Sequence, residues 1–153
     1  MLVAMRKAKG IGLAAPQVGL SLQLFVADVR DPEATPLLDG QPVDPAAIMP
    51  MLFANAEVTV PAGEPATYAE GCLSFPGIRG DVVRPDAITV TFQDEAGVPH
   101  VLECNGLLAR CIQHEVDHLN GVLFIDRMED DVRAKLDAEV KELAKETKAA
   151  TKA

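Results

Sequence analysis

The feature that most constrains the fold is the run His114-Glu115-Val116-Asp117-His118, which places two histidines four residues apart. In an α-helix, residues at this spacing lie on one face, about 6 Å apart along the axis. The surrounding sequence predicts such a helix from Gly106 to about Leu119, with Asn105 as N-cap and Asn120-Gly121 at its end. The fold must therefore accommodate a helix that carries two imidazoles on one face.

Helical spacing also predicts the buried side of this helix. That side carries mainly apolar residues and one carboxylate: Leu108, Cys111, Ile112, Glu115, Leu119 and Val122. A buried carboxylate is unfavourable unless it has a partner or a chemical task. Glu115 is therefore a candidate functional residue.

Two imidazoles on one helix face can bind one divalent metal ion. The ion lowers the pKa of a bound water from about 15.7 toward about 7, and a neighbouring carboxylate can take the proton. This H-E-x-x-H arrangement occurs in metal hydrolases. The alternative is an exposed helix with two surface histidines, but two of only three histidines fall in the pattern and the other helix face is apolar. These observations favour the metal site.

A catalytic metal site usually has three protein ligands and an open position. His100 lies in a predicted strand and is expected to be a surface histidine. Cys111 shares the helix, but its Cα lies about 10.5 Å along the axis from that of His118. A thiolate must approach the ion to about 2.3 Å, so we expect Cys111 to belong to the core.

Cys104 lies at a strand end and is expected to be structural. Cys72 follows Gly71, whose missing side chain permits close backbone approach. We expect Cys72 to lie in a loop and to be the best third ligand. A Cys-His-His set suits Fe²⁺ or Zn²⁺, and the spacing alone does not choose between them.

The rest of the chain predicts an α+β fold with an antiparallel sheet in one domain. Helix formers occupy Met1–Lys9, and a charged, Ala-rich helix is expected from Glu129 to about Lys148. A proline-rich segment, Asp31–Pro50, is expected to be an irregular loop. Strands are expected at Leu22–Val29, Leu52–Val60, Ala87–Gln93 and Val98–Glu103, the last two joined by a turn at Asp94–Gly97.

Composition excludes some functions. Residues 10–128 hold sixteen acidic and five basic side chains, which argues against direct DNA binding. The uncharged stretch Ile11–Ala27 is interrupted by Gly, Pro and Gln, so a loop and a strand are expected there rather than a signal peptide or membrane span. Three cysteines are too few for a disulfide scaffold and indicate a reducing compartment.

Three segments, taken together, resemble the signature segments of peptide deformylases. They are Gly10-Ile11-Gly12-Leu13-Ala14-Ala15-Pro16-Gln17, Glu70-Gly71-Cys72-Leu73-Ser74 and Gln113-His114-Glu115-Val116-Asp117-His118-Leu119. The resemblance covers about Met1 to Met128. It implies a single deformylase-like domain over residues 1–153, with antiparallel sheets packed around a central metal-binding helix and with residues 129–153 as a C-terminal helix and tail.

Enzymes of this family remove the formyl group from N-formylmethionine at the start of nascent peptides. The resemblance implies that Cys72, His114 and His118 are the metal ligands and that Glu115 is the general base and then the acid. It also implies that the Gln17 side chain and the backbone N–H of Leu73 bind the oxyanion. The implied substrate-binding residues are Ile11, Gly12, Tyr68, Gly71, Arg79, Leu107, Arg110 and Cys111.

The family's usual metal is Fe²⁺, and Zn²⁺ or Ni²⁺ often replaces it in purified protein. The resemblance further implies a cytoplasmic enzyme, or the mature chain of an organelle protein, that contacts no membrane and could meet the ribosome through its C-terminal helix. Members usually carry a longer segment before the first helix, which this sequence lacks. Two alternatives stay open: an inactive deformylase-like binding protein, and a metallopeptidase, since H-E-x-x-H also serves peptide hydrolysis.

Overall fold

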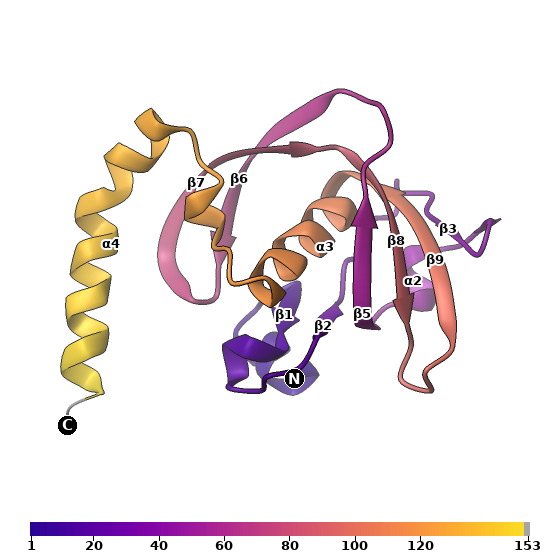
Figure 1. Cartoon of the computed structure of the whole chain (residues 1–153), viewed down its shortest axis with the longest axis horizontal. Helices are drawn as coiled ribbons and strands as arrows, with labels where there is room; N and C mark the ends of the chain where they lie inside the picture. The colour runs from indigo at the N-terminus through magenta and orange to yellow at the C-terminus, as the bar shows by residue number, and fades with distance from the viewer. Residues whose placement is uncertain (152–153) are drawn as a thin grey trace. The chain divides into compact units, whose positions relative to one another are not determined.

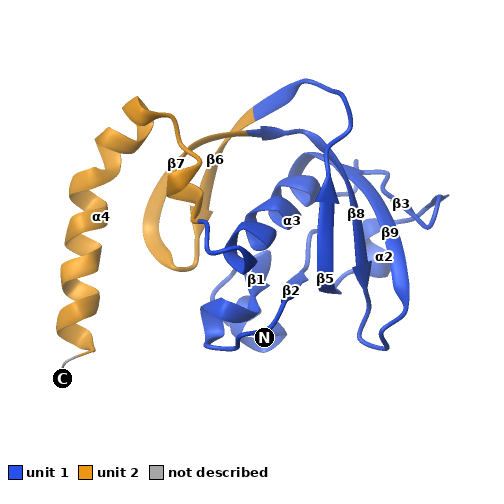
Figure 2. Cartoon of the chain, in the orientation of Figure 1, with its two compact units in different colours: residues 1–66, 84–122 blue, residues 67–83, 123–153 orange. Residues whose placement is uncertain are grey.

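The computed structural model describes residues 1–151, and the chain forms two compact units (Figure 2). Unit 1 contains Met1–Ala66 and Arg84–Val122, and unit 2 contains Thr67–Val83 and Leu123–Ala153. The last two residues of the predicted C-terminal tail, Lys152 and Ala153, lie outside the described residues. None of the described helices is both long enough and apolar enough to span a membrane.

Unit 1 is built on a seven-stranded sheet in the order β1-β2-β5-β8-β9-β3-β4, and each neighbouring pair is antiparallel. This confirms the predicted α+β class with an antiparallel sheet. The strand bounds are β1 Gly12–Ala14, β2 Leu24–Ala27, β3 Leu37–Leu38, β4 Gln41–Pro42, β5 Met51–Thr59, β8 Ala87–Gln93 and β9 Pro99–Asn105.

Helix α3, Gly106–Leu119, packs against this sheet in unit 1 (Figure 1). The core between them contains stacked Phe25 and Phe53 rings, with centroids 4.6 Å apart, and the buried side chains of Ile88, Val90, Leu102, Leu108 and Ile112. The helix bounds match the prediction. Asn105 is the N-cap residue as expected, but its side chain makes no capping hydrogen bond. The turn into the helix uses Gly106 instead, whose φ of +59° favours glycine.

The predicted helix at the N-terminus is α1, Leu2–Lys7, and it buries Met5. A short 3-10 helix, η1, covers Ala15–Val18. The irregular loop predicted at Asp31–Pro50 is wrong in part, because this segment contains β3, β4 and helix α2, Pro45–Ile48. Local chemistry explains the helix: the Asp44 side chain accepts a hydrogen bond from the Ala46 N–H, and proline occupies the first helical position.

Unit 2 holds most of β6, Pro65–Cys72, and β7, Phe75–Pro85, with the 3-10 helix η2, Phe124–Asp126, and helix α4, Asp130–Ala150. Strands β6 and β7 form a two-stranded sheet. The unit's core is apolar and includes one side of α4: Ile78, Val82, Phe124, Ile125, Met128, Val132, Leu136, Val140 and Leu143. Helix α4 confirms the predicted C-terminal helix.

The sequence analysis missed β1, β6 and β7, and the expectation that Cys72 lies in a loop is wrong. Cys72 is the last residue of β6. The reason is compositional: β6 contains Pro, Gly and Ala, and β7 contains two glycines and two prolines, so neither shows the alternation of a half-buried strand.

Candidate active site

Helix α3 in unit 1 places both histidines of the motif on one face. The centroids of the His114 and His118 rings are 4.9 Å apart, with the ring planes at 74°. His118 is buried and His114 is half-buried, so the pair sits where side chains are partly shielded from water. The predicted geometry of two adjacent imidazoles is present.

Glu115 lies on the buried side of α3, with 4% of its surface exposed. Strand β1 approaches it closely, because a Cβ atom added at Gly12 would collide with Oε1 of Glu115 and lie 2.8 Å from Sγ of Cys111. The Cys111 thiol also donates to the carbonyl of Ile11 at 3.5 Å. Only a glycine lets the backbone of this strand lie against the carboxylate.

Gln17 lies in η1, directly after β1. Its side-chain Oε1 accepts a hydrogen bond from the Ala14 N–H at 2.9 Å. If the Gln17 amide were rotated by 180°, its NH₂ group would face the Ala14 N–H, and two donors would oppose each other. The hydrogen bond therefore fixes the amide oxygen of Gln17 toward the backbone of Ala14. Gln17 consequently directs its amide N–H groups away from β1, which is the orientation that an oxyanion donor needs.

A buried ion pair joins α3 to the end of β7. Arg84 Nη1 donates to Asp117 Oδ2 at 2.8 Å, and both side chains are less than a tenth exposed. Beside it, Gln113 Nε2 donates to the carbonyl of Pro85 at 3.0 Å. This role of Asp117 was not predicted from the sequence, although a second acid in a helix with a predicted buried side was a signal that it needed a partner.

In unit 2, Cys72 ends β6 and is half-buried, and Leu73 and Ser74 form the link to β7. The Ser74 N–H donates to Sγ of Cys72 at 3.4 Å. Burial raises the pKa of Cys104 to about 12, which suits the structural role expected for that residue.

The residues implied for substrate binding fall in both units. In unit 2, Tyr68 is exposed, Gly71 faces Arg79, and Arg79 donates to the carbonyl of Ala69 at 2.8 Å. In unit 1, Ile11 and Leu107 are exposed, whereas Arg110 and Cys111 are buried.

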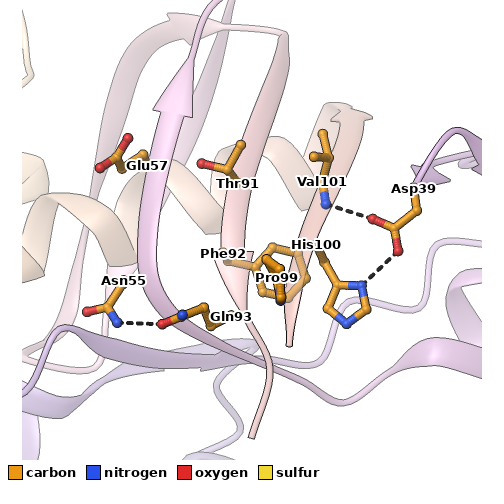
Figure 3. A pocket seen from close by; sticks show the side chains of 9 residues that line it. All are labelled: Asp39, Asn55, Glu57, Thr91, Phe92, Gln93, Pro99, His100 and Val101. Atoms are coloured by element: carbon orange, nitrogen blue, oxygen red, sulfur yellow. Dashed lines mark hydrogen bonds and ion pairs between the residues drawn. The ribbon is translucent and has the colours of Figure 1, made fainter. Parts of the chain in front are cut away.

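A second cluster of titratable side chains contains His100, and Figure 3 shows this histidine beside Asp39. Its Nδ1 lies 2.7 Å from Asp39 and its Nε2 lies 3.4 Å from Asp94. The hydrogen bond to Asp39 raises the pKa of His100, and the same bond lowers the pKa of Asp39. An open pocket of about 580 Å³ adjoins the cluster. His100 is half-buried and lies between two carboxylates.

An antiparallel sheet packed on a helix with an H-E-x-x-H run defines a class of metal-hydrolase folds. A sequence model described as polypeptide deformylase matches residues 1–134. A peptide deformylase of Opitutus terrae is 62% identical over 99% of this chain and 81% of its own length. The chain belongs to the polypeptide deformylase family, as the resemblance implied, and is thereby a hydrolase.

Other similar proteins and structures are also peptide deformylases. A peptide deformylase of Synechococcus sp. strain CC9605 is 51% identical over 85% of this chain, which spans 59% of that protein. The structure of a Synechococcus elongatus peptide deformylase with actinonin covers 91% of this chain and 70% of its own, at a TM-score of 0.75 and 44% identity. Arabidopsis thaliana peptide deformylase 1B covers 100% and 78%, at a TM-score of 0.82 and 37% identity. These structures confirm the predicted fold.

Proposed function

We propose that this protein hydrolyses the formyl group from N-formylmethionyl nascent peptides and releases formate. The observation that carries the proposal is the buried Glu115 carboxylate, which adjoins the histidine pair in sequence and which β1 approaches at Gly12. The family and the names of its relatives supply the reaction class.

We propose that Cys72, His114 and His118 hold one divalent metal ion. One thiol and two imidazoles form a donor set of the type that binds such ions. When bound, the ion would lower the pKa of a water molecule. We propose Fe²⁺ as the physiological ion, with Zn²⁺ or Ni²⁺ able to replace it in purified protein.

Glu115 serves first as base and then as acid. It accepts a proton from the attacking water as the new carbon–oxygen bond forms at the formyl carbon. It then returns this proton to the amine nitrogen as the carbon–nitrogen bond breaks, leaving formate and a free amino terminus. A carboxylate held in one place by burial, with β1 alongside, is suited to both transfers.

Gln17 and Leu73 stabilise the negative charge that develops on the formyl oxygen. The Gln17 amide N–H groups point away from β1 because Ala14 engages the other end of the amide. Leu73 contributes its backbone N–H from the link that follows Cys72. Each well-placed donor of this kind is worth about 10²–10³ in kcat.

We propose that the residues implied by the resemblance bind the substrate. Ile11 and Leu107 have the exposure that direct contact requires. The full proposed set is Ile11, Gly12, Tyr68, Gly71, Arg79, Leu107, Arg110 and Cys111. We also propose that the enzyme works in the cytoplasm and meets the ribosome through α4.

The test is a formate-release assay on protein loaded anaerobically with Fe²⁺, with metal analysis of the same sample. We expect formate and deformylated peptide in equal amounts from a formyl-Met peptide. Release of amino acids without formate would instead support a metallopeptidase. Full metal occupancy without turnover would support an inactive binding protein, and either result would overturn the proposed activity.

A further inference from the structure

The segment that carries Cys72 is flanked on both sides by residues of unit 1. This segment, Thr67–Val83, leaves unit 1 after Ala66 and returns to it at Arg84. Both of these flanking residues of unit 1 are bonded to the helix that carries His114 and His118.

At the start of the segment, Arg110 Nη2 donates to the carbonyl of Ala66 at 2.6 Å. Arg110 is only 7% exposed, and it precedes His114 by one helical turn. Burying a guanidinium is unfavourable unless its hydrogen bonds compensate, and a charged donor makes a strong bond to a carbonyl. The burial of Arg110 therefore secures the position of Ala66 against α3.

At the end of the segment, the Arg84–Asp117 ion pair and the bond from Gln113 to the Pro85 carbonyl hold the chain on the same helix. Arg84 and Asp117 are both buried. The two attachments use positions 110, 113 and 117 of α3, which flank His114 in the sequence.

We propose that Arg110 is a positioning residue for the metal site, and that it acts with the Arg84–Asp117 pair to fix on α3 the two residues that flank the Cys72 segment, Ala66 and Arg84. This proposal rests on Cys72, His114 and His118 being the metal ligands. Fixing the residues that flank a segment removes conformations before the ion binds, so less ordering remains to be done on binding. Residues that hydrogen-bond to metal ligands change metal affinity by about 10–100-fold, and we expect Arg110, which acts through Ala66, to fall at the lower end of this range.

The test is a Co²⁺ titration followed through the thiolate-to-cobalt charge-transfer absorption. Arg110→Met removes the donor but keeps a long side chain, and we expect it to weaken Co²⁺ binding by about tenfold or more and to reduce the band. Arg110→Lys can still donate to Ala66, so we expect it to recover most of the affinity.

Arg30→Met is the matched control. Arg30 Nη2 also donates to a backbone carbonyl, that of Met49 at 2.9 Å, but this bond does not hold the Cys72 segment. We expect Arg30→Met to leave Co²⁺ affinity unchanged. If circular dichroism shows that Arg110→Met does not fold, Arg110→Gln takes its place. Glutamine is also polar, but its side chain is shorter than that of arginine and should not reach the Ala66 carbonyl.

The outcomes separate this proposal from the proposed function. Wild-type Co²⁺ affinity in a folded Arg110→Met variant, with a thiolate band in the unsubstituted protein, would overturn the positioning role alone. A missing thiolate band in the unsubstituted protein would overturn the ligand set and the positioning role with it. A rise in KM for the formyl peptide with unchanged Co²⁺ affinity would place Arg110 only in the substrate cleft and also overturn the positioning role.

Discussion

Helices α3 and α4 differ in the burial of their charged side chains. Helix α3 buries charged side chains within unit 1, among them Arg110, Glu115 and Asp117. Helix α4 in unit 2 has no fully buried residue, and it contributes partly buried apolar side chains to its core. Most charged groups on α4 are exposed to water, where a charge needs no partner. A buried charged group, such as those on α3, needs a partner or a chemical task.

The ion pairs of the two helices differ in the same way. The Arg84–Asp117 pair on α3 is buried. On α4, the Lys135–Asp131 and Lys145–Glu142 pairs are exposed, and the Arg133–Asp137 pair is half-buried. An exposed pair contributes about 0.2–1 kcal/mol, while breaking a buried pair leaves a charge without compensation.

The largest expected difference comes from removing one acid on each helix. Asp117→Asn should lower the free energy of unfolding of the metal-free protein by about 3–5 kcal/mol, because Arg84 stays buried and charged. Glu142→Gln, which breaks the exposed pair with Lys145, should cost less than about 1 kcal/mol. Urea unfolding of both variants measures the loss in the free energy of unfolding. Equal losses in the two variants would mean that burial does not distinguish the two ion pairs.

The second comparison concerns two cysteines, one in each unit. Cys72→Ser should lower metal affinity by about 100-fold or more, because a proposed ligand is lost. Cys111→Ser should leave metal affinity unchanged, since that thiol bonds to the Ile11 carbonyl in the core. The measurement is the metal content of both variants after equilibrium dialysis. Loss of metal from Cys111→Ser but not from Cys72→Ser would reject Cys72 as a ligand.

Two glycines give a third comparison. Gly12→Ala should reduce kcat/KM for a formyl peptide by about 100-fold, because its Cβ displaces the Glu115 carboxylate. In unit 2, a Cβ at Gly80 would meet the ends of the Met128 and Leu136 side chains, at 2.7 and 2.9 Å, which can move aside. Gly80→Ala should therefore cost about 1 kcal/mol of stability and little activity. Steady-state kinetics and urea unfolding are measured for both variants. Normal activity in Gly12→Ala would contradict the close approach of the Gly12 backbone to the Glu115 carboxylate.

The smallest expected effect is a pH dependence at His100. Its pKa is raised by Asp39, so its contribution to stability is complete below about pH 6.5 and is lost as the pH rises through the higher pKa of the folded state. The pKa of Asp39 is lowered, so its contribution is lost only in acid. His100→Gln should lower Tm by about 1–3 °C more at pH 6 than at pH 9. Equal shifts at both pH values would show that the charge of His100 adds nothing.

Strong periodicity made helix α3 and strand β8 predictable from the sequence with correct bounds. The helical repeat of apolar residues and the alternation at 88, 90 and 92 are local signals. Strands β6 and β7 could not be predicted in this way, because their glycines and prolines carry no period and their pairing decides their conformation.

The candidate site shows the same limit. The spacing of His114 and His118 predicted adjacent rings, and the structure has them. The partners of Asp117 and Arg110 lie 33 and 44 residues away in the sequence, so no local pattern could pair them. Their burial on α3 becomes evident only once the helix is packed. The ligand set and the substrate contacts stay predictions.

The central claim is that Glu115 moves the proton in a metal-dependent deformylation. It is tested most directly by Glu115→Gln, with Fe²⁺ content and formate release from a formyl-Met peptide measured on the same anaerobic sample. We expect metal content equal to that of the unsubstituted protein and formate release lower by about 10²–10⁴-fold. Formate release near the unsubstituted rate, at equal metal content, would contradict the assignment of Glu115.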